Sequence, residues 1–141
     1  WRLVAVTDRR TKVDFAQQMK WLADEQYPEA EVIRVILDNL NTHRPAALYE
    51  AFAPEEARRI LRRLRFHYTP KHGSWLNMAE LELSVFDRPG WNRRMGDQET
   101  LAQETRALED ERNAGRATIN WHFTNRKARH KLHRLYPPIS Q

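Results

Sequence analysis

The sequence predicts an α/β fold, in which helices flank a sheet. Residues 32–37, VIRVIL, form a nearly continuous apolar run rich in β-branched side chains, which is typical of a strand buried on both faces. Residues 11–27 place apolar side chains three and four positions apart, which is typical of an amphipathic helix. Residues 1–7, WRLVAVT, have the composition of a further strand. The order strand, helix, strand therefore predicts a β–α–β unit, with a right-handed crossover if the strands are parallel.

Prolines and a glycine set the limits of the expected elements. Pro28 ends the first helix, Pro45 and Pro54 each begin another, and Pro70 ends a brief strand. Gly115 ends a long polar helix. In chain order, we expect strands at 1–7, 32–37 and 66–69, and helices at 11–27, at 45–52, from 54, and at 76–86, 97–113 and 125–135. We expect two parts, a core at 1–96 and a helical extension at 97–141 that packs on it.

Composition bounds the class of protein. Hydrophobic residues make up 40% of the 141 positions and charged residues 30%, which is usual for a globular chain and too apolar for general disorder. No apolar run approaches the ~18 residues of a membrane-spanning helix. The chain has no cysteine, which excludes disulfides and thiolate metal sites and fits a cytoplasmic bacterial protein.

Positive charge is concentrated at the C-terminal end of the chain. The formal net charge is +5, and residues 120–141 contain no acid. The basic residues of this stretch are Arg126, Lys127, Arg129, Lys131 and Arg134. Such a tail indicates a polyanionic partner, most commonly nucleic acid, although it is also typical of a solvated helix face.

The apolar run at 32–37 ends abruptly in Asp38 and Asn39. The carboxyl ends of strands are where open α/β sheets place their ligand sites, and an acid there sits on rigid backbone, as a metal ligand should. Asp38 and Asn39 are equally suited to making a turn and capping the next helix. The stretch therefore leaves a metal ligand and a structural turn as two open interpretations of Asp38.

Glu80 is a second acid at a boundary of the same kind, near the start of the helix expected at 76–86. The chemistry that requires paired acids on a rigid frame is two-metal phosphoryl transfer, in which two Mg²⁺ ions about 3.5–4 Å apart clamp the attacking and leaving oxygens. Mg²⁺ prefers hard oxygen ligands and keeps several waters, so a few carboxylates suffice. Acids are common, and spacing alone is weak support for such a site.

Three segments carry a more specific signal: LDNLNTH at 37–43, HYTPKHGSWLNMAE at 67–80 and ELSVFDRPGWNRR at 82–94. Together, in this order, they resemble the catalytic domain of DDE transposases. The likeness is to insertion-sequence transposases of the mariner superfamily, which are related in fold to retroviral integrases and RNase H. The resemblance extends over nearly the whole chain. It implies an RNase H-like mixed sheet and metal-dependent DNA strand cleavage and strand transfer.

The resemblance implies a role for each matching residue. Asp38 corresponds to the second metal-binding acid, with Asn39 completing the family's Asp-Asn signature, and Glu80 corresponds to the third acid. His43 matches the histidine after that signature, as a residue that orients the loop, approaches a phosphate or simply caps the structure. The two acids would hold Mg²⁺ or Mn²⁺ while water attacks DNA first and a DNA 3′-hydroxyl attacks second.

The sequence departs from the family at its beginning. The first acid of the triad should lie on a strand upstream of WRLVAVT, and Asp8 follows the wrong strand, in a turn rich in charge. The helix-turn-helix region that reads transposon ends is likewise not in residues 1–141. We therefore expect the C-terminal part of a truncated or split catalytic domain, with an incomplete sheet and no efficient catalysis on its own. A missing N-terminal half or a homodimer would complete it.

Two functions of another kind stay open, as do several contacts. The chain could be a non-catalytic remnant that binds DNA or transposase subunits, or a structure-specific nuclease of the same fold. Transposon ends and target DNA would be its partners, in the bacterial cytoplasm close to the nucleoid.

A zinc site at His67 and His72 is unfavourable, because the two lie five residues apart across a loop without cysteines. The expected contacts with the DNA backbone are Lys71, His72, Arg126, Lys127, Arg129 and Lys131.

Overall fold

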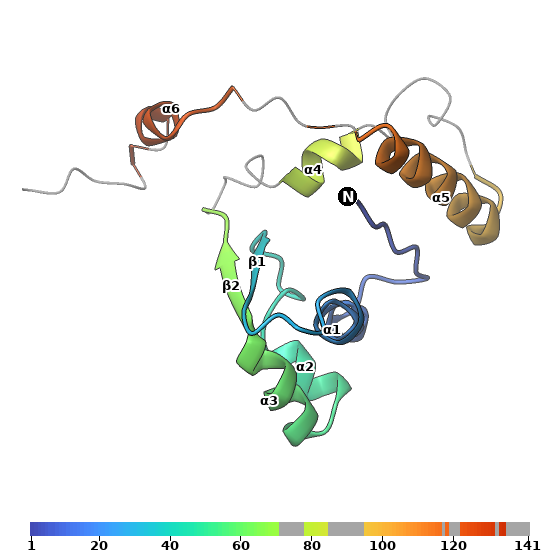
Figure 1. The fold of residues 1–141 in the computed structure, drawn as a ribbon, viewed down its shortest axis with the longest axis vertical. Helices are drawn as coiled ribbons and strands as arrows, with labels where there is room; N and C mark the ends of the chain where they lie inside the picture. The colour runs from blue at the N-terminus through green and yellow to red at the C-terminus, as the bar shows by residue number, and fades with distance from the viewer. Residues whose placement is uncertain (71–77, 85–94, 117, 119–121, 132, 135–141) are drawn as a thin grey trace, which may run out of the picture.

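The computed structural model describes residues 1–70, 78–84, 95–116, 118, 122–131 and 133–134. Its elements in chain order are α1 (Lys12–Trp21), the π-helix η1 (Leu22–Gln26), β1 (Ile33–Leu37), α2 (Ala46–Ala51), α3 (Pro54–Arg63), β2 (Leu64–Tyr68), α4 (Met78–Leu83), α5 (Gln98–Ala114) and α6 (Asn125–Lys131). Figure 1 shows α1, α2 and α3 grouped around the strands, with α4 and α5 beyond the end toward which both strands run. The predicted α/β class is confirmed for the described residues.

The described strands form a two-stranded parallel sheet. Its register pairs Ile33 with Leu64 and, at the other end, Leu37 with Tyr68. The chain crosses from β1 to β2 through α2 and α3, because parallel strands need a long connection rather than a tight turn. The sheet therefore has one edge at which the carboxyl ends of both strands lie side by side.

Only one face of this sheet is buried. Ile33 and Leu37 face the core and are 7% and 6% exposed, whereas Ile36, on the opposite face, is 68% exposed. The expectation that this strand is buried on both faces was wrong, because the described helices cover only the face that carries the alternate residues. The core comprises Ala16, Met19, Ala23, Ile33, Leu48, Ala57, Ile60 and Leu64.

Local signals explain the helix that precedes β1. Thr11 caps α1 through its side chain, and the Asp14 carboxylate returns the contact to the Thr11 backbone, which makes a capping box. The helix then continues as η1 to Gln26, close to the predicted end before Pro28. Arg63, at the end of α3, donates hydrogen bonds to carbonyl oxygens of this region. Its acceptors are Ala23 at 2.7 Å, Ala30 at 2.8 Å, Pro28 at 2.9 Å and Tyr27.

Residues 1–7 do not form the predicted strand. They pair with no strand in the described structure and instead run alongside α5, as Figure 1 shows near the N-terminus. The backbone N–H of Arg2 donates to Asn113 Oδ1 at 2.8 Å, and that of Val4 donates to Glu109 Oε2 at 2.9 Å. The alternating pattern was wrongly interpreted as a strand, because the hydrogen-bond partners are side chains of a helix more than 100 residues away, which no local pattern indicates.

The remaining helices agree with the sequence in place and differ in length. The N-cap Asp97 accepts a hydrogen bond from Thr100 N, and Gly115 follows the end of α5, as predicted. The helix expected at 76–86 is described from Met78 to Leu83, and the other expected residues, except Ser84, lie outside the described part. In the described ranges, no helix is long and apolar enough to cross a membrane.

Candidate metal centre

Asp38 lies directly after β1, at the carboxyl edge of the sheet. The end of β2 fixes the loop that begins there. The backbone N–H of Thr69 donates to Leu37 O at 2.9 Å, and the Asn39 side-chain amide donates to the backbone oxygen of Thr69. Two strands thus position Asp38 and Asn39, which is the location that the sequence predicted for a ligand.

The carboxylate of Asp38 is half-buried and, among the described residues, takes part in two contacts, both through Oδ1. The Leu40 backbone N–H donates to it at 3.1 Å, and His43 Nδ1 lies 2.7 Å from it. The Leu40 contact is the turn that the structural interpretation of Asp38 predicted. Pro45, with no side-chain cap, precedes α2, so the predicted capping of the next helix does not occur. Oδ2 takes part in neither contact, so the turn leaves one carboxylate oxygen for an ion.

His43 is itself fixed by its surroundings. Its backbone oxygen accepts a hydrogen bond from the Tyr68 hydroxyl at 2.8 Å, and its ring lies 5.0 Å from that of Phe15, between centroids. The guanidinium of Arg44 covers the Tyr68 ring at 5.1 Å. The backbone of His43 is thus bonded to the end of β2 and its ring packs against α1. Together these contacts restrict the orientation of the Asp38 carboxylate.

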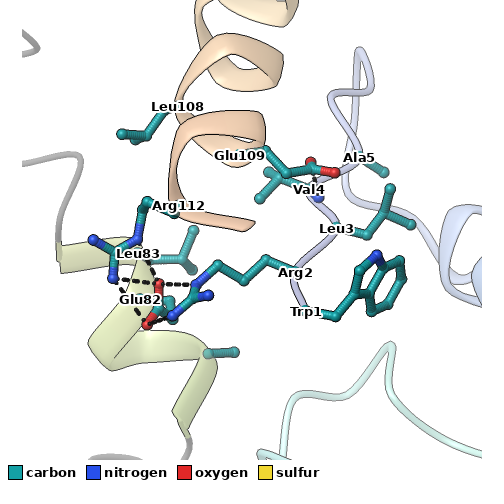
Figure 2. A pocket seen from close by; sticks show the side chains of 11 residues that line it. Trp1, Arg2, Leu3, Val4, Ala5, Glu82, Leu83, Leu108, Glu109 and Arg112 are labelled. Atoms are coloured by element: carbon teal, nitrogen blue, oxygen red, sulfur yellow. Dashed lines mark hydrogen bonds and ion pairs between the residues drawn. The ribbon is translucent and has the colours of Figure 1, made fainter. Parts of the chain in front are cut away.

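Helix α4 carries two acids with different surroundings. Glu80 is exposed, whereas Glu82 is bound between two guanidinium groups, as Figure 2 shows. Arg2 contacts Glu82 at 2.7 and 3.0 Å, and Arg112 contacts it at 3.0 and 3.1 Å. Hydrogen bonds from Arg2 and then from Arg112 lower the pKa of Glu82 to about 2, against the opposing effect of burial. Glu82 is therefore a structural anion, and Glu80 is the acid of α4 that stays accessible to a ligand.

The other predicted residues are distributed as follows. Lys71 and His72 lie outside the described residues, and with them the test of a zinc site shared with His67. Asp8 is exposed in the turn before α1. The basic residues of α6 that were predicted to contact DNA, all exposed, are Arg126, Lys127, Arg129 and Lys131.

The donor set suits a hard cation only in part. Carboxylate oxygens, such as those of Asp38 and Glu80, are the ligands that Mg²⁺ and Mn²⁺ prefer. Within the described ranges, no three histidine or acidic side chains lie close enough together to hold a metal ion. The described residues therefore offer single oxygen donors of the right type, not an assembled cage.

Comparison with known proteins decides the family. A family model described as DDE superfamily endonuclease matches residues 1–102. The chain belongs to this family. The match includes Asp38 and Glu80 and ends within α5, and endonucleases of the DDE superfamily act on DNA and depend on divalent metal ions. No curated protein and no solved structure gave a significant match. Membership implies an RNase H-like fold, of which the two-stranded parallel sheet and its helices are the described part.

Sequence reasoning missed two contacts that shape this DDE superfamily chain. The hydrogen bond from Tyr68 to the His43 backbone had no signal beyond the position of Tyr68 at the end of a strand. The binding of Glu82 by Arg2 and Arg112 joins residues 80 and 30 positions apart, and the sequence shows only unremarkable charges at those places.

Proposed function

We propose that this chain is catalytic-domain sequence of a DDE transposase of the mariner-like insertion-sequence type. The reaction is metal-dependent cleavage of a DNA strand by water, followed by strand transfer to a DNA 3′-hydroxyl. Asp38 and Glu80 hold the divalent ions, Mg²⁺ or Mn²⁺, with Asn39 and His43 in supporting roles. The family match supports the reaction class, and the finer assignment rests on the matching motifs.

The observation that carries the proposal is the placement of Asp38. It lies at the carboxyl edge of the sheet, His43 Nδ1 contacts its Oδ1 at 2.7 Å, and its second oxygen takes part in neither described contact. An ion bound there would supply Lewis-acid stabilisation of the charge that develops on the transferred phosphate. The chain supplies orientation, because most of the catalytic power in phosphoryl transfer comes from positioning and electrostatics.

The proposal extends to the rest of the chain. Residues 1–96 form the catalytic part, and residues 97–141 form an extension that contributes contacts to DNA. Lys71, His72 and the exposed basic side chains of α6 would contact phosphates without reading sequence. The partners are transposon ends and target DNA, and a second transposase subunit.

Metal binding tests the ligands directly. We expect Mn²⁺, followed by the loss of its free-ion electron paramagnetic resonance signal, to bind the chain with an affinity that falls at least tenfold in Asp38→Asn and in Glu80→Gln. Two variants with the same charge change serve as controls: Asp8→Asn, in the turn before α1, and Glu55→Gln, exposed in the first turn of α3. Wild-type affinity in Asp38→Asn, with far-ultraviolet circular dichroism unchanged, would contradict the proposal.

One observation favours a second candidate function. Because the described residues bring no three acidic or histidine side chains together, a chain that binds DNA or transposase subunits without cutting is the alternative. That function predicts duplex binding that Mn²⁺ does not change and that Asp38→Asn does not alter. Duplex binding that Mn²⁺ strengthens, and that Asp38→Asn weakens while Asp8→Asn does not, would exclude it.

A further inference from the structure

A small cavity lies on the side of His43 where residues 5–11 meet α1. Its volume is about 180 Å³, roughly six times the ~30 Å³ that one water occupies in the liquid. This is below the ~300–1,000 Å³ of pockets that enclose a small molecule. A cavity of this size accepts one tetrahedral group with its immediate substituents, not a nucleoside.

Two residues of the lining, Arg10 and Gln18, bring side-chain hydrogen-bond donors, and His43, Ala5 and Phe15 also line the cavity. Thr7 lines it too, but its hydroxyl donates to Arg9 O at 2.7 Å. Arg10 is exposed, and among the residues that the structure describes it takes part in no ion pair. A guanidinium beside an amide donor is a combination that recognises a phosphate.

One acid, Asp14, also lines the cavity and has to be accounted for. Its Oδ2 accepts hydrogen bonds from Thr11 N at 2.7 Å and from Thr11 Oγ1 at 2.5 Å. These contacts form the capping box of α1 and lower the pKa of Asp14. The Asp14 carboxylate is therefore hydrogen-bonded within the start of α1, and Arg10 is the charged residue of the lining that can bind an anionic ligand.

We propose that Arg10, Gln18 and His43 form a binding site for one phosphodiester of the DNA strand, next to the proposed metal ligand Asp38. The shared residue is His43, which lines the cavity and contacts Asp38 at 2.7 Å. A phosphate held by Arg10 would place the DNA backbone beside the carboxylate and fix the register of the strand. The site rests on the proposed function for its ligand, since the DNA reaches the cavity only if Asp38 belongs to the active site.

Adjacent residues provide matched controls. Arg9 belongs to the same exposed turn as Arg10 but does not line the cavity, and Gln17 stands in the same relation to Gln18. We would measure binding of a fluorescent 30-base-pair duplex by anisotropy over a range of salt concentrations, with Ca²⁺ present, for the chain and for Arg10→Gln, Arg9→Gln, Gln18→Ala and Gln17→Ala.

Loss of a dedicated phosphate contact has two signatures. Arg10→Gln is expected to weaken duplex binding about tenfold and to reduce the slope of log K against log salt by about 1, because one fewer counterion is released. Gln18→Ala is expected to weaken binding severalfold with the slope unchanged, since it removes a donor and no charge. Arg9→Gln and Gln17→Ala should stay within twofold of the wild-type affinity.

The result separates this site from the proposed function. Equal effects of Arg10→Gln and Arg9→Gln, with Mn²⁺ binding by Asp38 intact, would overturn the phosphate site alone. Loss of the metal result, with the Arg10 and Gln18 effects present, would leave a phosphate site and remove the catalytic assignment. Thermal unfolding of each variant, expected within a few degrees of wild type, guards against a general loss of structure.

Discussion

Two regions of the molecule are held together by different forces. Residues 12–70 enclose an apolar core, to which Leu48 and Ile60 contribute fully buried side chains. Residues 1–5, α4 and α5 are joined by the ion pairs of Glu82 with two guanidinium groups. These pairs lie beside a cavity of about 470 Å³ whose lining includes Leu3, Leu83 and Leu108 (Figure 2). Burial of apolar area resists pH and salt, whereas exposed and half-exposed ion pairs do not. The candidate ligand Asp38 is therefore positioned by the apolar core, whereas Glu80 lies on a helix that the ion pairs of Glu82 hold in place.

A substitution in the apolar core tests the first half of this comparison. Leu48→Ala removes a side chain with 0% exposure from the core, so we expect the free energy of unfolding to fall by about 2–5 kcal/mol. Urea titration followed by circular dichroism at 222 nm would measure it. The matched control is Leu83→Ala, a leucine of α4 that is 54% exposed and should cost well under 1 kcal/mol. Equal losses would contradict a core confined to residues 12–70.

Acid should separate the two regions. Hydrogen bonds from Arg59 and Lys20 lower the pKa values of Asp24 and Glu56 to about 2, and the pKa of Glu82 is also about 2. Since these folded-state values lie below the unfolded ones, near 3.8 and 4.5, the ion pairs stabilise fully above about pH 5 and are lost as pH falls toward 2. Ion pairs weaken in both regions over this range, but residues 12–70 keep their apolar core, so near pH 3 we expect the junction at Glu82 to open first.

Hydrogen exchange would resolve this sequence of events. Protection in α5 should fall at a higher pH than protection in α1 and α3, after correction for intrinsic exchange rates. Sodium chloride at 1 M should act in the same direction at pH 7, because it screens the half-exposed pairs of Glu82. Simultaneous loss of protection in both regions would show that they unfold as one cooperative unit.

A single substitution tests the same junction at neutral pH. Glu82→Gln removes the charge that Arg2 and Arg112 share, so we expect the N-terminal segment to detach at a cost of about 1.5–3 kcal/mol, confined to that region. Fluorescence of Trp1 and Trp21, whose rings stack at 6.0 Å, should report the separation. Glu99→Gln, in the first turn of α5, serves as the control. An unchanged spectrum in Glu82→Gln would show that other contacts hold the segment.

The smallest expected effect concerns the start of α1. Thr11→Ala removes the hydroxyl of the capping box and should lower the free energy of unfolding by about 1 kcal/mol. Thr11→Ser keeps a hydroxyl, so it should retain most of the stability that the cap contributes. Urea denaturation at pH 7 would measure both. A loss of the same size in both variants would locate the effect in the threonine methyl group rather than in the cap.

The parts of the fold that local chemistry dictates were predictable. Thr11 and Pro28 bracketed α1 with η1, and Asp97 and Gly115 bracketed α5, because caps and helix breakers act within a few residues. Asp38 was placed correctly after a strand. The failures involve distant partners: residues 1–7 form no strand and bind α5, and Ile36 is exposed although the run at 32–37 was expected to be buried throughout. A pattern of apolar residues shows which side chains prefer burial, not which surface covers them.

The same division applies to the candidate site. Asp38 follows a strand, as predicted, and Glu80 is exposed, but whether the two acids bind the same ions stays a prediction. The motifs pointed to Asp38, Asn39, His43 and Glu80 as candidates, and the structure added a reason to prefer Glu80 over Glu82 as a ligand. That reason depends on Arg2 and Arg112, whose proximity arises only when the chain has folded.

The hydrogen bond from the Tyr68 hydroxyl to the His43 backbone makes the position of His43 depend on the register of the sheet. Leu37 pairs with Tyr68, and successive side chains of a strand point to opposite faces. A shift of β2 by one position would therefore move the Tyr68 side chain to the other face of the sheet and break its hydrogen bond with the His43 backbone. Extra residues between α2 and α3 would leave that alignment intact, whereas one residue inserted within β2 would displace it. The α2–α3 connection therefore tolerates insertions and β2 does not.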